Sequence, residues 1–570
     1  MMRFKRASTL EKIAELEEWT TTTASPGKRL RMREKAPPRP GDLPAALAAG
    51  LADLNKAGPK SPLLMPWHSV QTGPALPRRR FAKDFIDRAM ANLDADVRNN
   101  LITNIITISN GCDSPLAKYE NGDEEYIVRF GSICSGSEIC LSVFPHLESA
   151  FRELVGAPVR LLHCWSCESD ESKRLWITSN FDIHQMFGDV QTLTDPEGSW
   201  DFISDSRQKP LPVDIIIAGF SCRDASRLSA KQQAMRGVVG TDEAQSSTTG
   251  GTFRGLASSV KELKPSLVLM ENVPGLMDKP RHGGQSNYQM VIEEFHSMEY
   301  AFASRVFDAA ETGIPQRRKR LWMAAVRSDR GQGTANGHDK DGYECQLRTK
   351  ANQILDQILS QCVHYSLDEF LVGGSGNEIL QRWWPKEKLA ADFSSDDPAD
   401  SQAADTVSAT RKWPDLHKKV FNKEAKGMAV HLDLHMESLK DNCHFHRLSG
   451  RQQDLLCNAL AVSTHRRGCG SADCADSLDG LVIELLHSAN RWAKNHGATP
   501  CQLPKSIHWL VSQKRCLSGA ESLLVQGADG HNLRALQPSC WDNAFLQNLG
   551  GNAFCTSQCV AWFVSVLAAM

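Results

Sequence analysis

The sequence lacks several features that define other classes of protein. Its 570 residues contain no uninterrupted hydrophobic run of membrane-spanning length. Residues 1–6 lack the long apolar segment of a signal peptide, so we expect an intracellular protein whose cysteines are reduced thiols. The net charge of −2 gives no global attraction to nucleic acid, so any basic surface must be local.

Metal-binding patterns are also sparse. Cys164 and Cys167 have the spacing of a metal-binding pair, but no second pair follows to complete four ligands. A looser group of histidines and cysteines lies between residues 443 and 474. We expect no metal site in this chain.

The sequence does contain apolar runs that each end in polar residues. Residues 126–133, 159–165, 213–221 and 266–270 have the length and composition of buried strands in a parallel sheet. In an open α/β sheet, the carboxyl ends of such strands line the ligand crevice. The pattern therefore predicts an α/β fold whose functional groups lie at these strand ends.

The first strand ends carry groups suited to a nucleoside. Ser135 and Gly136 belong to a small-residue turn whose backbone N–H groups can approach an anionic ligand. Glu168 follows the second strand and suits hydrogen bonds from ribose hydroxyls, although Asp170 is close enough to compete for this role. Asp189 supplies another acid after a third segment.

The later strand ends carry a thiol and a carboxyl group. Cys222 opens a long polar loop, and Glu271 follows the next apolar run. A thiolate is a nucleophile, and a carboxyl group with a raised pKa in a dry pocket is a proton donor. Arg318 and Arg320 alternate along a later strand, which would put two guanidinium groups on one face.

The order and content of these segments resemble the S-adenosylmethionine-dependent cytosine-C5 DNA methyltransferase family. The matching segments are a first cofactor motif at 132–144, the catalytic Pro-Cys motif at 219–222, the Glu-Asn-Val motif at 271–273, the Gln-x-Arg-x-Arg segment at 313–320, the ninth motif at 515–521 and the tenth at 551–554. Together they span residues 126–330 and 511–570.

The resemblance implies a Rossmann-like methyltransferase fold with a smaller inserted target-recognition domain. The expected parts are a largely disordered basic and proline-rich N-terminal region (1–120), a catalytic domain (121–330), a target-recognition domain with a disordered insert (331–510) and C-terminal motifs that complete the catalytic domain (511–570). Within the first part, residues 83–101 have the composition of a helix that leads into the catalytic domain.

The resemblance also implies roles for individual residues. The methyl donor S-adenosyl-L-methionine would be held by Ile133, Ser135, Gly136, Glu168, Asp189 and Asn552. Cys222 would add to C6 of cytosine, Glu271 would protonate N3, and Arg318 and Arg320 would hold O2. A stacked base cannot reach such a pocket, so a DNA substrate implies a flipped-out cytosine.

Two departures from the family pattern leave alternatives open. Ser221 stands where the family has proline, and Arg223 where it has glutamine. Proline fixes φ and so sets the direction of the thiol, whereas serine leaves that turn to its surroundings. The alternatives are an RNA (tRNA) cytosine-5 methyltransferase and a catalytically silent nucleic-acid-binding relative. We expect a DNA enzyme that acts in the nucleus, given the basic segment at 28–35, with no membrane association.

The loop that follows Cys222 generates a first prediction. It is long, polar and rich in glycine, and we expect it to close over nucleic acid. Deleting residues 232–240 should therefore lower kcat for methyl transfer to DNA by about 100-fold, because the target base would no longer be held in place. Steady-state kinetics on duplex DNA would check this, and full turnover by the deletion variant would contradict it.

Overall fold

The computed structural model describes residues 80–109, 117–118, 124–134, 136–227, 248–279, 283–330, 340–373, 413–424, 438–466, 478–486, 494–533, 536 and 541–570. All of them belong to one compact unit, Val70–Met570. The basic segment at 28–35, Ser135 and the loop at 232–240 lie outside the described residues.

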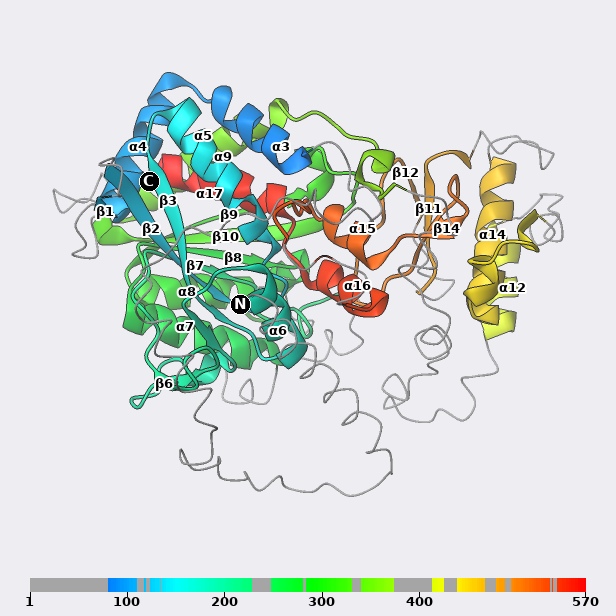
Figure 1. Cartoon of the computed structure of the whole chain (residues 1–570), viewed down its shortest axis with the longest axis horizontal. Coiled ribbons are helices and arrows are strands. Elements are labelled where there is room, and N and C mark those ends of the chain that lie inside the picture. Colours follow the sequence, from blue (N-terminus) through cyan, green and yellow to red (C-terminus); the bar gives the residue numbers. More distant parts are fainter. Residues whose placement is uncertain are drawn as a thin grey trace, which may run out of the picture. The chain divides into compact units, whose positions relative to one another are not determined.

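A ten-stranded mixed sheet forms the centre of this unit (Figure 1). Its strands are β1 (Ala117–Lys118), β2 (Glu124–Ile133), β3 (Val159–Cys167), β4 (Gln185–Phe187), β5 (Ser199–Asp201), β6 (Ser206–Gln208), β7 (Ile215–Ala218), β8 (Leu267–Asn272), β9 (Tyr300–Asp308) and β10 (Lys319–Arg327). Their order is β6-β5-β4-β3-β2-β7-β8-β10-β9, with β1 paired to β2.

The middle of the sheet is parallel, as the apolar runs predict. Strands β4, β3, β2, β7 and β8 run parallel to their neighbours in this series, whereas β10 is antiparallel to both β8 and β9. The chain runs outward from β2 through β3 to β4, and then returns to place β7 on the other side of β2. The crevice at such a reversal, outside the carboxyl ends of β2 and β7, is where open α/β sheets bind ligands.

Helices enclose the sheet. The α-helices are α3 (Phe81–Ala91), α4 (Ala95–Ser109), α5 (Phe144–Ala150), α6 (Glu171–Asn180), α7 (Thr248–Leu263), α8 (Asn287–Ser297), α9 (Lys340–Ser360), α12 (Trp413–Glu424), α14 (Gly450–Arg466), α15 (Gly519–Leu524), α16 (Asn543–Asn552) and α17 (Thr556–Ala569). Short 3₁₀ or π segments are η2 (Ile139–Val143), η3 (Phe151–Val155), η4 (Val190–Thr192), η6 (Pro274–Met277), η7 (Ala309–Thr312), η8 (Ser328–Arg330), η9 (Leu367–Phe370) and η11 (Phe445–Arg447).

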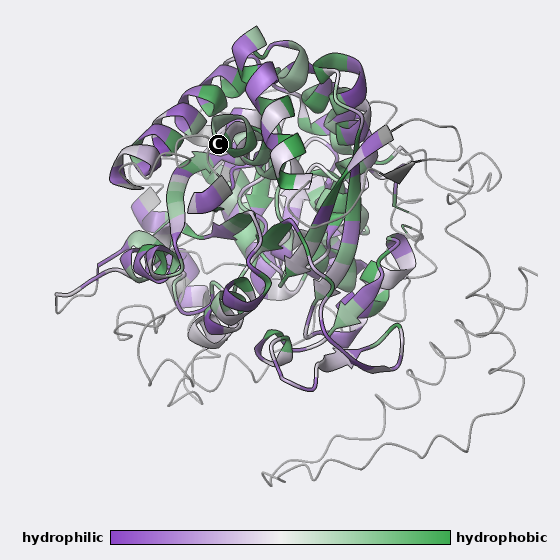
Figure 2. Ribbon diagram, turned by 90° about the vertical axis from the view of Figure 1, so that its left-hand side faces the viewer, coloured by the Kyte–Doolittle hydropathy of each residue, from purple (hydrophilic) through white to green (hydrophobic). Residues whose placement is uncertain are grey.

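Side chains alternate between two hydrophobic cores, one on each face of the sheet. Along β7, Ile215 and Ile217 enter the core that includes α3, α4, α5, α9 and α17. Ile216 and Ala218 enter the opposite core, with α7 and α8. Because both faces are covered, the central strands are apolar at nearly every position, and Figure 2 shows hydrophobic residues along them.

The helix expected at 83–101 is present, but as two helices. These are α3 and α4, which Asn92 and the two residues after it separate. Both bury an apolar face in the core shared with α17, and Asn104 Nδ2 donates to the Leu567 carbonyl at 2.8 Å. Local composition alone did not indicate this packing, because the partner helix lies at the other end of the chain.

A second sheet lies in the inserted region. Its antiparallel strands are β11 (Leu481–Glu484), β12 (Lys494–His496), β13 (His508–Leu510) and β14 (Arg515–Cys516), in the order β12-β11-β13-β14. The helices α12 and α14 pack on each other, with His417 Nδ1 and Asp454 Oδ2 2.5 Å apart.

The structure moves both boundaries expected for this region. Residues 340–373 contribute α9 and η9 to the large core rather than to the insertion, because α9 packs against β9 and α17. The second sheet continues past residue 510 through β14. Within the described residues, α9 and η9 therefore belong to the large core, and the second sheet extends to Cys516.

The final helices return to the large sheet. Residues Asn543–Ala569 are long and apolar enough by composition to cross a membrane, but 94% of their apolar window is buried inside the protein. Every residue of α17 is buried, where it packs against α9 and α4. A helix that is apolar on all sides and covered in this way is a core helix.

The ninth motif contains a buried ion pair. Arg515 Nη1 and Nη2 donate to the two carboxylate oxygens of Glu521 at 2.8 and 2.7 Å, and the side chains are 3% and 0% exposed. The same carboxylate accepts from the backbone N–H groups of Ser518 and Val372. One acid therefore joins β14, the start of α15 and the segment after η9.

Breaking this pair should be costly. We expect Glu521→Ala to lower the free energy of unfolding by about 3–5 kcal/mol, because the Arg515 cation would stay buried without a counter-charge. Urea denaturation would measure this. The control is Asp356→Ala, which breaks the exposed Arg305–Asp356 pair and should cost less than about 1 kcal/mol. Equal losses in the two variants would contradict the expectation.

Candidate active site

The predicted functional segments meet at one edge of the large sheet. The last residue of β2, Ile133, pairs with Ala218 at the end of β7, and Ala218 pairs with Met270 on β8. The loops that follow these three strands are therefore neighbours. They carry the first cofactor motif, the Cys222 turn and the Glu271 segment, which the sequence analysis assigned to one site.

The Cys222 turn is held closely on both sides. The Gly219 N–H donates to the Ile133 carbonyl at 2.9 Å. A Cβ atom at Gly219 would lie 2.6 Å from Phe554 Cε1 and 2.9 Å from the Cys134 carbonyl oxygen, so only glycine fits here. Gly219, three residues before Cys222, thus packs between Cys134 of the first motif and Phe554 of the tenth.

Asn272 fastens the turn from the side of β8. This side chain is 1% exposed, and its Nδ2 donates to the Phe220 carbonyl at 3.0 Å. Its Oδ1 accepts from the Val273 N–H at 2.8 Å. The asparagine of the Glu-Asn-Val segment therefore has a structural task, and the glutamate beside it stays available for chemistry.

Cys222, Glu271 and Arg320 form a cluster of charged and titratable groups. Arg320 Nε lies 2.6 Å from Glu271 Oε1, and the two side chains are only 10% and 13% exposed. Cys222 is open to solvent on one side. Desolvation by the surrounding protein, and then the Glu271 carboxylate, raise the pKa of the Cys222 thiol above its ordinary value, while Arg320 acts in the opposite direction.

Arg318 takes a different position from the one expected. It lies just before β10 and is 3% exposed. Its Nη1 donates to the Gln502 carbonyl at 3.0 Å, and its Nη2 to the Ala553 carbonyl at 2.7 Å. Burial, and then the positive charge of Arg320, lower the pKa of Arg318. Both terminal nitrogens are therefore occupied by main-chain oxygens, and Arg320 is the arginine that faces the thiol and the carboxylate.

The cofactor residues also converge. Burial, followed by the charges of Glu168 and Asp189, raises the pKa of the Cys134 thiol to about 12, which places both acids near the end of β2. Glu168 is 7% exposed, whereas Asp170 caps α6 by accepting from the Lys173 N–H at 3.2 Å. Asp170 is therefore committed to the helix, and Glu168 is the acid that lies in the crevice. Asp189 is exposed at the start of η4.

Gly136 and Asn552 meet although 415 residues separate them in the chain. Gly136 has a φ of +75°, and a Cβ atom there would lie 3.0 Å from the Asn552 carbonyl oxygen. A turn without a side chain, faced by α16 and by two acids, fits a ligand with a ribose and a cationic group. The Ile133 side chain is fully buried, and its carbonyl accepts from the Gly219 N–H. Ser135 lies outside the described residues.

A family model for C-5 cytosine-specific DNA methylases matches residues 158–457, which is more than half of the chain. The chain belongs to this family. It is 24% identical over 451 residues to DNA (cytosine-5-)-methyltransferase DMT5 of Cryptococcus neoformans var. grubii, covering 75% of this chain and 16% of that protein. It is 33% identical over 135 residues to the type II methyltransferase M.HhaI of Haemophilus parahaemolyticus, covering 24% and 36% of the two chains.

A solved structure, the S. pombe Dnmt2 methyltransferase, matches with a TM-score of 0.36 and 10% identity over 77% of this chain and 98% of that chain. This chain spans only 16% and 36% of the two sequence relatives. The family model therefore shows the family of this chain. Its activity is proposed below.

Cys501 lies beside the charge cluster but carried no recognisable signal in the sequence. Cys501 Sγ lies 3.7 Å from Arg320 Nη2, although their positions in the chain are 181 apart. Burial alone would lower the pKa of the Arg320 guanidinium, but the acidic groups around it, Cys501 and Glu271 first, raise it overall. A lone cysteine beyond the insertion cannot be assigned to a site by spacing, so only the structure reveals it.

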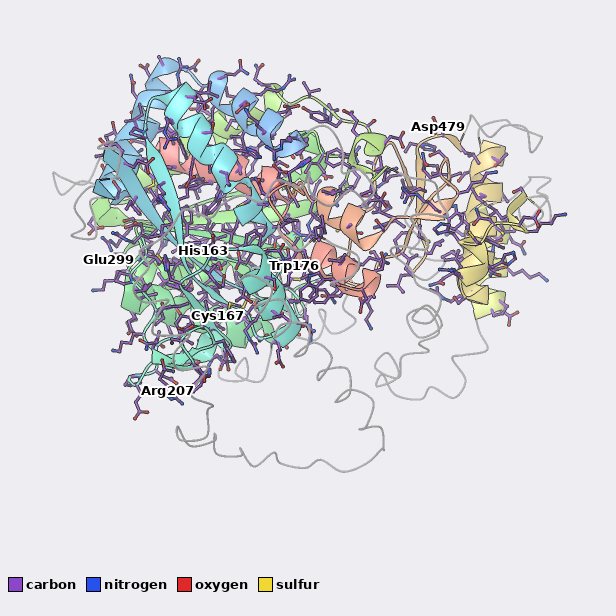
Figure 3. All side chains as sticks on the ribbon, viewed as in Figure 1. His163, Cys167, Trp176, Arg207, Glu299 and Asp479 are labelled. Carbon is purple, nitrogen blue, oxygen red and sulfur yellow. The ribbon has the colours of Figure 1, made fainter. Side chains whose placement is uncertain are left out.

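Beneath the first motif lies a buried polar cluster. Glu138, with a φ of +54°, accepts from Ser166 Oγ at 3.0 Å and from Ser132 Oγ. His163 lies beside both serines on β3, where Figure 3 labels it with Cys167. Burial lowers the pKa of His163 to about 3, so the imidazole is neutral. Two hydroxyls, from β2 and β3, therefore donate to one carboxylate in the first motif, beside a neutral imidazole.

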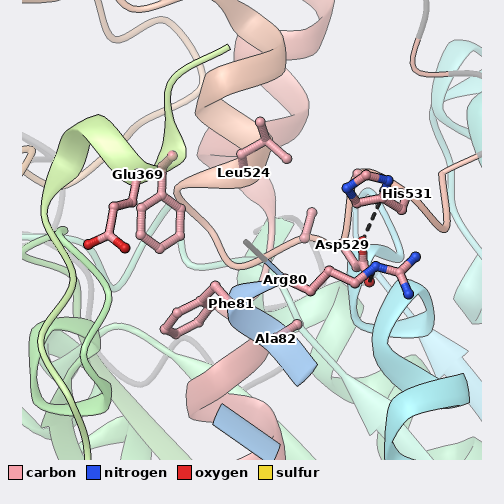
Figure 4. Close-up of a pocket in the computed structure, with 10 residues that line it drawn as sticks. Arg80, Phe81, Ala82, Glu369, Leu524, Asp529 and His531 are labelled. Atoms are coloured by element: carbon pink, nitrogen blue, oxygen red, sulfur yellow. Dashed lines mark hydrogen bonds and ion pairs between the residues drawn. The ribbon is translucent and has the colours of Figure 1, made fainter. Parts of the chain in front are cut away.

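One cavity of about 250 Å³ is lined by Gly313, Pro315, Tyr365 and Ala498, among others. The pocket in Figure 4, lined by Arg80, Phe81, Leu524 and Asp529 among others, has a cavity volume of about 30 Å³, too small for a nucleoside. The parts of the chain that the structure describes bring no three histidine, cysteine or acidic side chains together as metal ligands. Residues 467–477 of the looser histidine and cysteine group lie outside them.

The charge cluster generates a prediction about pH. Since the Glu271 carboxylate raises the pKa of Cys222, Glu271→Gln should move the onset of Cys222 alkylation by iodoacetamide to lower pH. At pH 8 the rate should rise by up to about tenfold, the change that one unit in the pKa gives. Peptide-resolved mass spectrometry would measure it. Glu294→Gln, an exposed change on α8, is the matched control, and an unchanged profile in Glu271→Gln would contradict the assignment.

Proposed function

We propose that this chain transfers a methyl group from S-adenosyl-L-methionine to C5 of a flipped-out cytosine in DNA, through a covalent adduct with Cys222. The observation that carries the proposal is the convergence of Cys222, Glu271 and Arg320 beside the turn of the first cofactor motif. A thiol, a carboxyl group and a guanidinium are the three kinds of group that addition to a cytosine ring requires.

The chemistry follows from the ring itself. Cytosine C5 is a weak nucleophile until sulfur adds to C6, when a sulfur–carbon bond forms and electron density moves to C5. Glu271 is placed to supply the proton that N3 needs as charge develops, and Arg320 to hold both Glu271 and O2 of the base. As the C5–methyl bond forms, the sulfur–methyl bond of the donor breaks and the donor leaves as a neutral thioether. A base then removes the C5 proton, the bond between Cys222 and C6 breaks, and the thiolate leaves.

The residues at the first motif fit the methyl donor. S-adenosyl-L-methionine supplies an electrophilic methyl group on a positively charged sulfur. Glu168 is the buried acid suited to its ribose hydroxyls, and Asp189 is the exposed acid suited to its adenine. The Gly136 turn and Asn552 form the opposite wall, where a side chain at Gly136 would intrude.

The two arginines of the Gln-x-Arg-x-Arg segment contact different groups, which supports a separate task for each. Arg320 contacts Glu271, and so it is the arginine proposed to bind the base. Arg318 is a positioning residue, because its terminal nitrogens bind the Gln502 and Ala553 carbonyls. The raised pKa of Cys222 means that the resting thiol is protonated at neutral pH, so it must lose its proton as it attacks C6.

Methyl transfer tests the proposal. With labelled methyl donor we expect transfer to duplex DNA, and a loss of at least about 1000-fold in Cys222→Ala, because the nucleophile is gone. The matched control is Cys345→Ala, an exposed cysteine on α9, which should leave the rate unchanged.

Each other outcome favours a stated alternative. Transfer to tRNA but not to duplex DNA would identify an RNA cytosine methyltransferase. Binding of the methyl donor with no transfer to either polymer would favour a silent relative, and transfer that survives in Cys222→Ala would exclude Cys222 as the nucleophile. If the proposal holds, we place the enzyme in the nucleus, where its DNA substrate is found.

A further inference from the structure

The turn that carries Cys222 begins with Ser221, where the family pattern has proline. Proline would fix φ and leave no N–H at this position. The Ser221 N–H instead donates to Thr252 Oγ1 on α7 at 3.0 Å. This hydrogen bond exists only because the proline is missing, and it fixes the residue directly before the thiol.

A second fastening lies on the other side of Cys222. The Asp224 N–H donates to Thr249 Oγ1 at 3.1 Å, and the Thr249 N–H donates to Asp224 Oδ2 at 3.0 Å. The turn is therefore bound to the first two turns of α7 both before and after the thiol. Three hydrogen bonds across two segments restrict its rotation in the way that a fixed φ angle would.

The hydroxyl of Thr252 is oriented to accept. Its Oγ1 donates within α7, to the carbonyls of Thr248 at 3.0 Å and Thr249 at 3.1 Å. A hydroxyl has one proton and two lone pairs, so committing the proton to the helix leaves a lone pair for the Ser221 N–H.

The first turns of α7 are held in place by close packing on two neighbouring segments. A Cβ atom at Gly255 would lie 2.8 Å from Val190 Cγ1, so the helix packs directly on η4. Phe253 is 2% exposed and contacts Phe220 of the Cys222 turn, with ring centroids 5.3 Å apart. Because Val190 follows Asp189, the same helix contacts both the thiol segment and the segment of the adenine-binding acid.

We propose that Thr252, with Thr249 and Asp224, is the positioning element that replaces the family proline and sets the direction of the Cys222 thiol. The inference rests on the proposed function in one respect, that Cys222 is the nucleophile. Thr252 acts through the Ser221 backbone and touches neither the base nor the methyl donor in this role.

The test begins with Thr252→Val, which keeps the shape of the side chain and removes the acceptor. We expect kcat for methyl transfer to fall by about tenfold, the effect of losing one hydrogen bond, and to fall by a larger factor than KM for DNA rises. Alkylation of Cys222, measured against Cys345 in the same sample across pH, should change as well, because the thiol would no longer be held in one direction.

Two control variants separate the acceptor from the rest of the side chain. Thr252→Ser keeps the hydroxyl and should stay near the wild-type rate. Thr103→Val, on α4, removes a hydroxyl that bonds only to the Asn99 carbonyl within its own helix, and should leave kcat unchanged. A loss in Thr252→Ser equal to that in Thr252→Val, or a similar loss in Thr103→Val, would overturn the proposal.

A proline at the turn gives the decisive comparison. Ser221→Pro has no N–H to donate, so adding Thr252→Val to it should cost less than about twofold, whereas the same change in the wild type costs about tenfold. Equal costs in the two backgrounds would overturn the proposal. If the wild type transfers no methyl group, the proposed function fails alone, because the alkylation of Cys222 in these variants still reports on its positioning.

Discussion

The site depends on one buried cation, the guanidinium of Arg318. It binds the main-chain carbonyls of Gln502 and Ala553, and so it holds the end of the insertion and the last helices against the start of β10. Asn552 then faces Gly136, and Phe554 closes on Gly219. Without that cation these carbonyls would lose their donor at a buried position, at a cost of about 1–3 kcal/mol each.

Two arginines separated by one residue thus do different physical work. Arg318 is surrounded by neutral oxygens that solvate it, which is a means of holding chain segments together. Arg320 lies between Glu271 and the Cys501 thiol, where its charge acts on groups that titrate. Their alternation in the sequence suggested a shared face and a shared ligand. The strand begins between them, at Lys319, and the two side chains have different partners.

The strands and most candidate residues could be predicted because parallel strands covered on both faces read as unbroken apolar runs, and their ends mark the crevice. Glu168, Asp189, Cys222 and Glu271 were chosen this way, and in the structure they lie at or just after the ends of β3, β4, β7 and β8. Long-range hydrogen bonds were beyond prediction. Nothing local distinguishes Thr252 or Cys501 from other residues of their types, since their partners are distant in the chain.

The clamp at Arg318 binds backbone oxygens, and every residue offers a backbone oxygen. The joint itself therefore uses no side-chain atom of Gln502 or Ala553. A change in the length or the surface residues of the stretch between η9 and β11 does not alter the atoms that Arg318 binds. A joint made to main-chain oxygens thus separates the length and side chains of the stretch between η9 and β11 from the geometry at Cys222, Glu271 and Arg320.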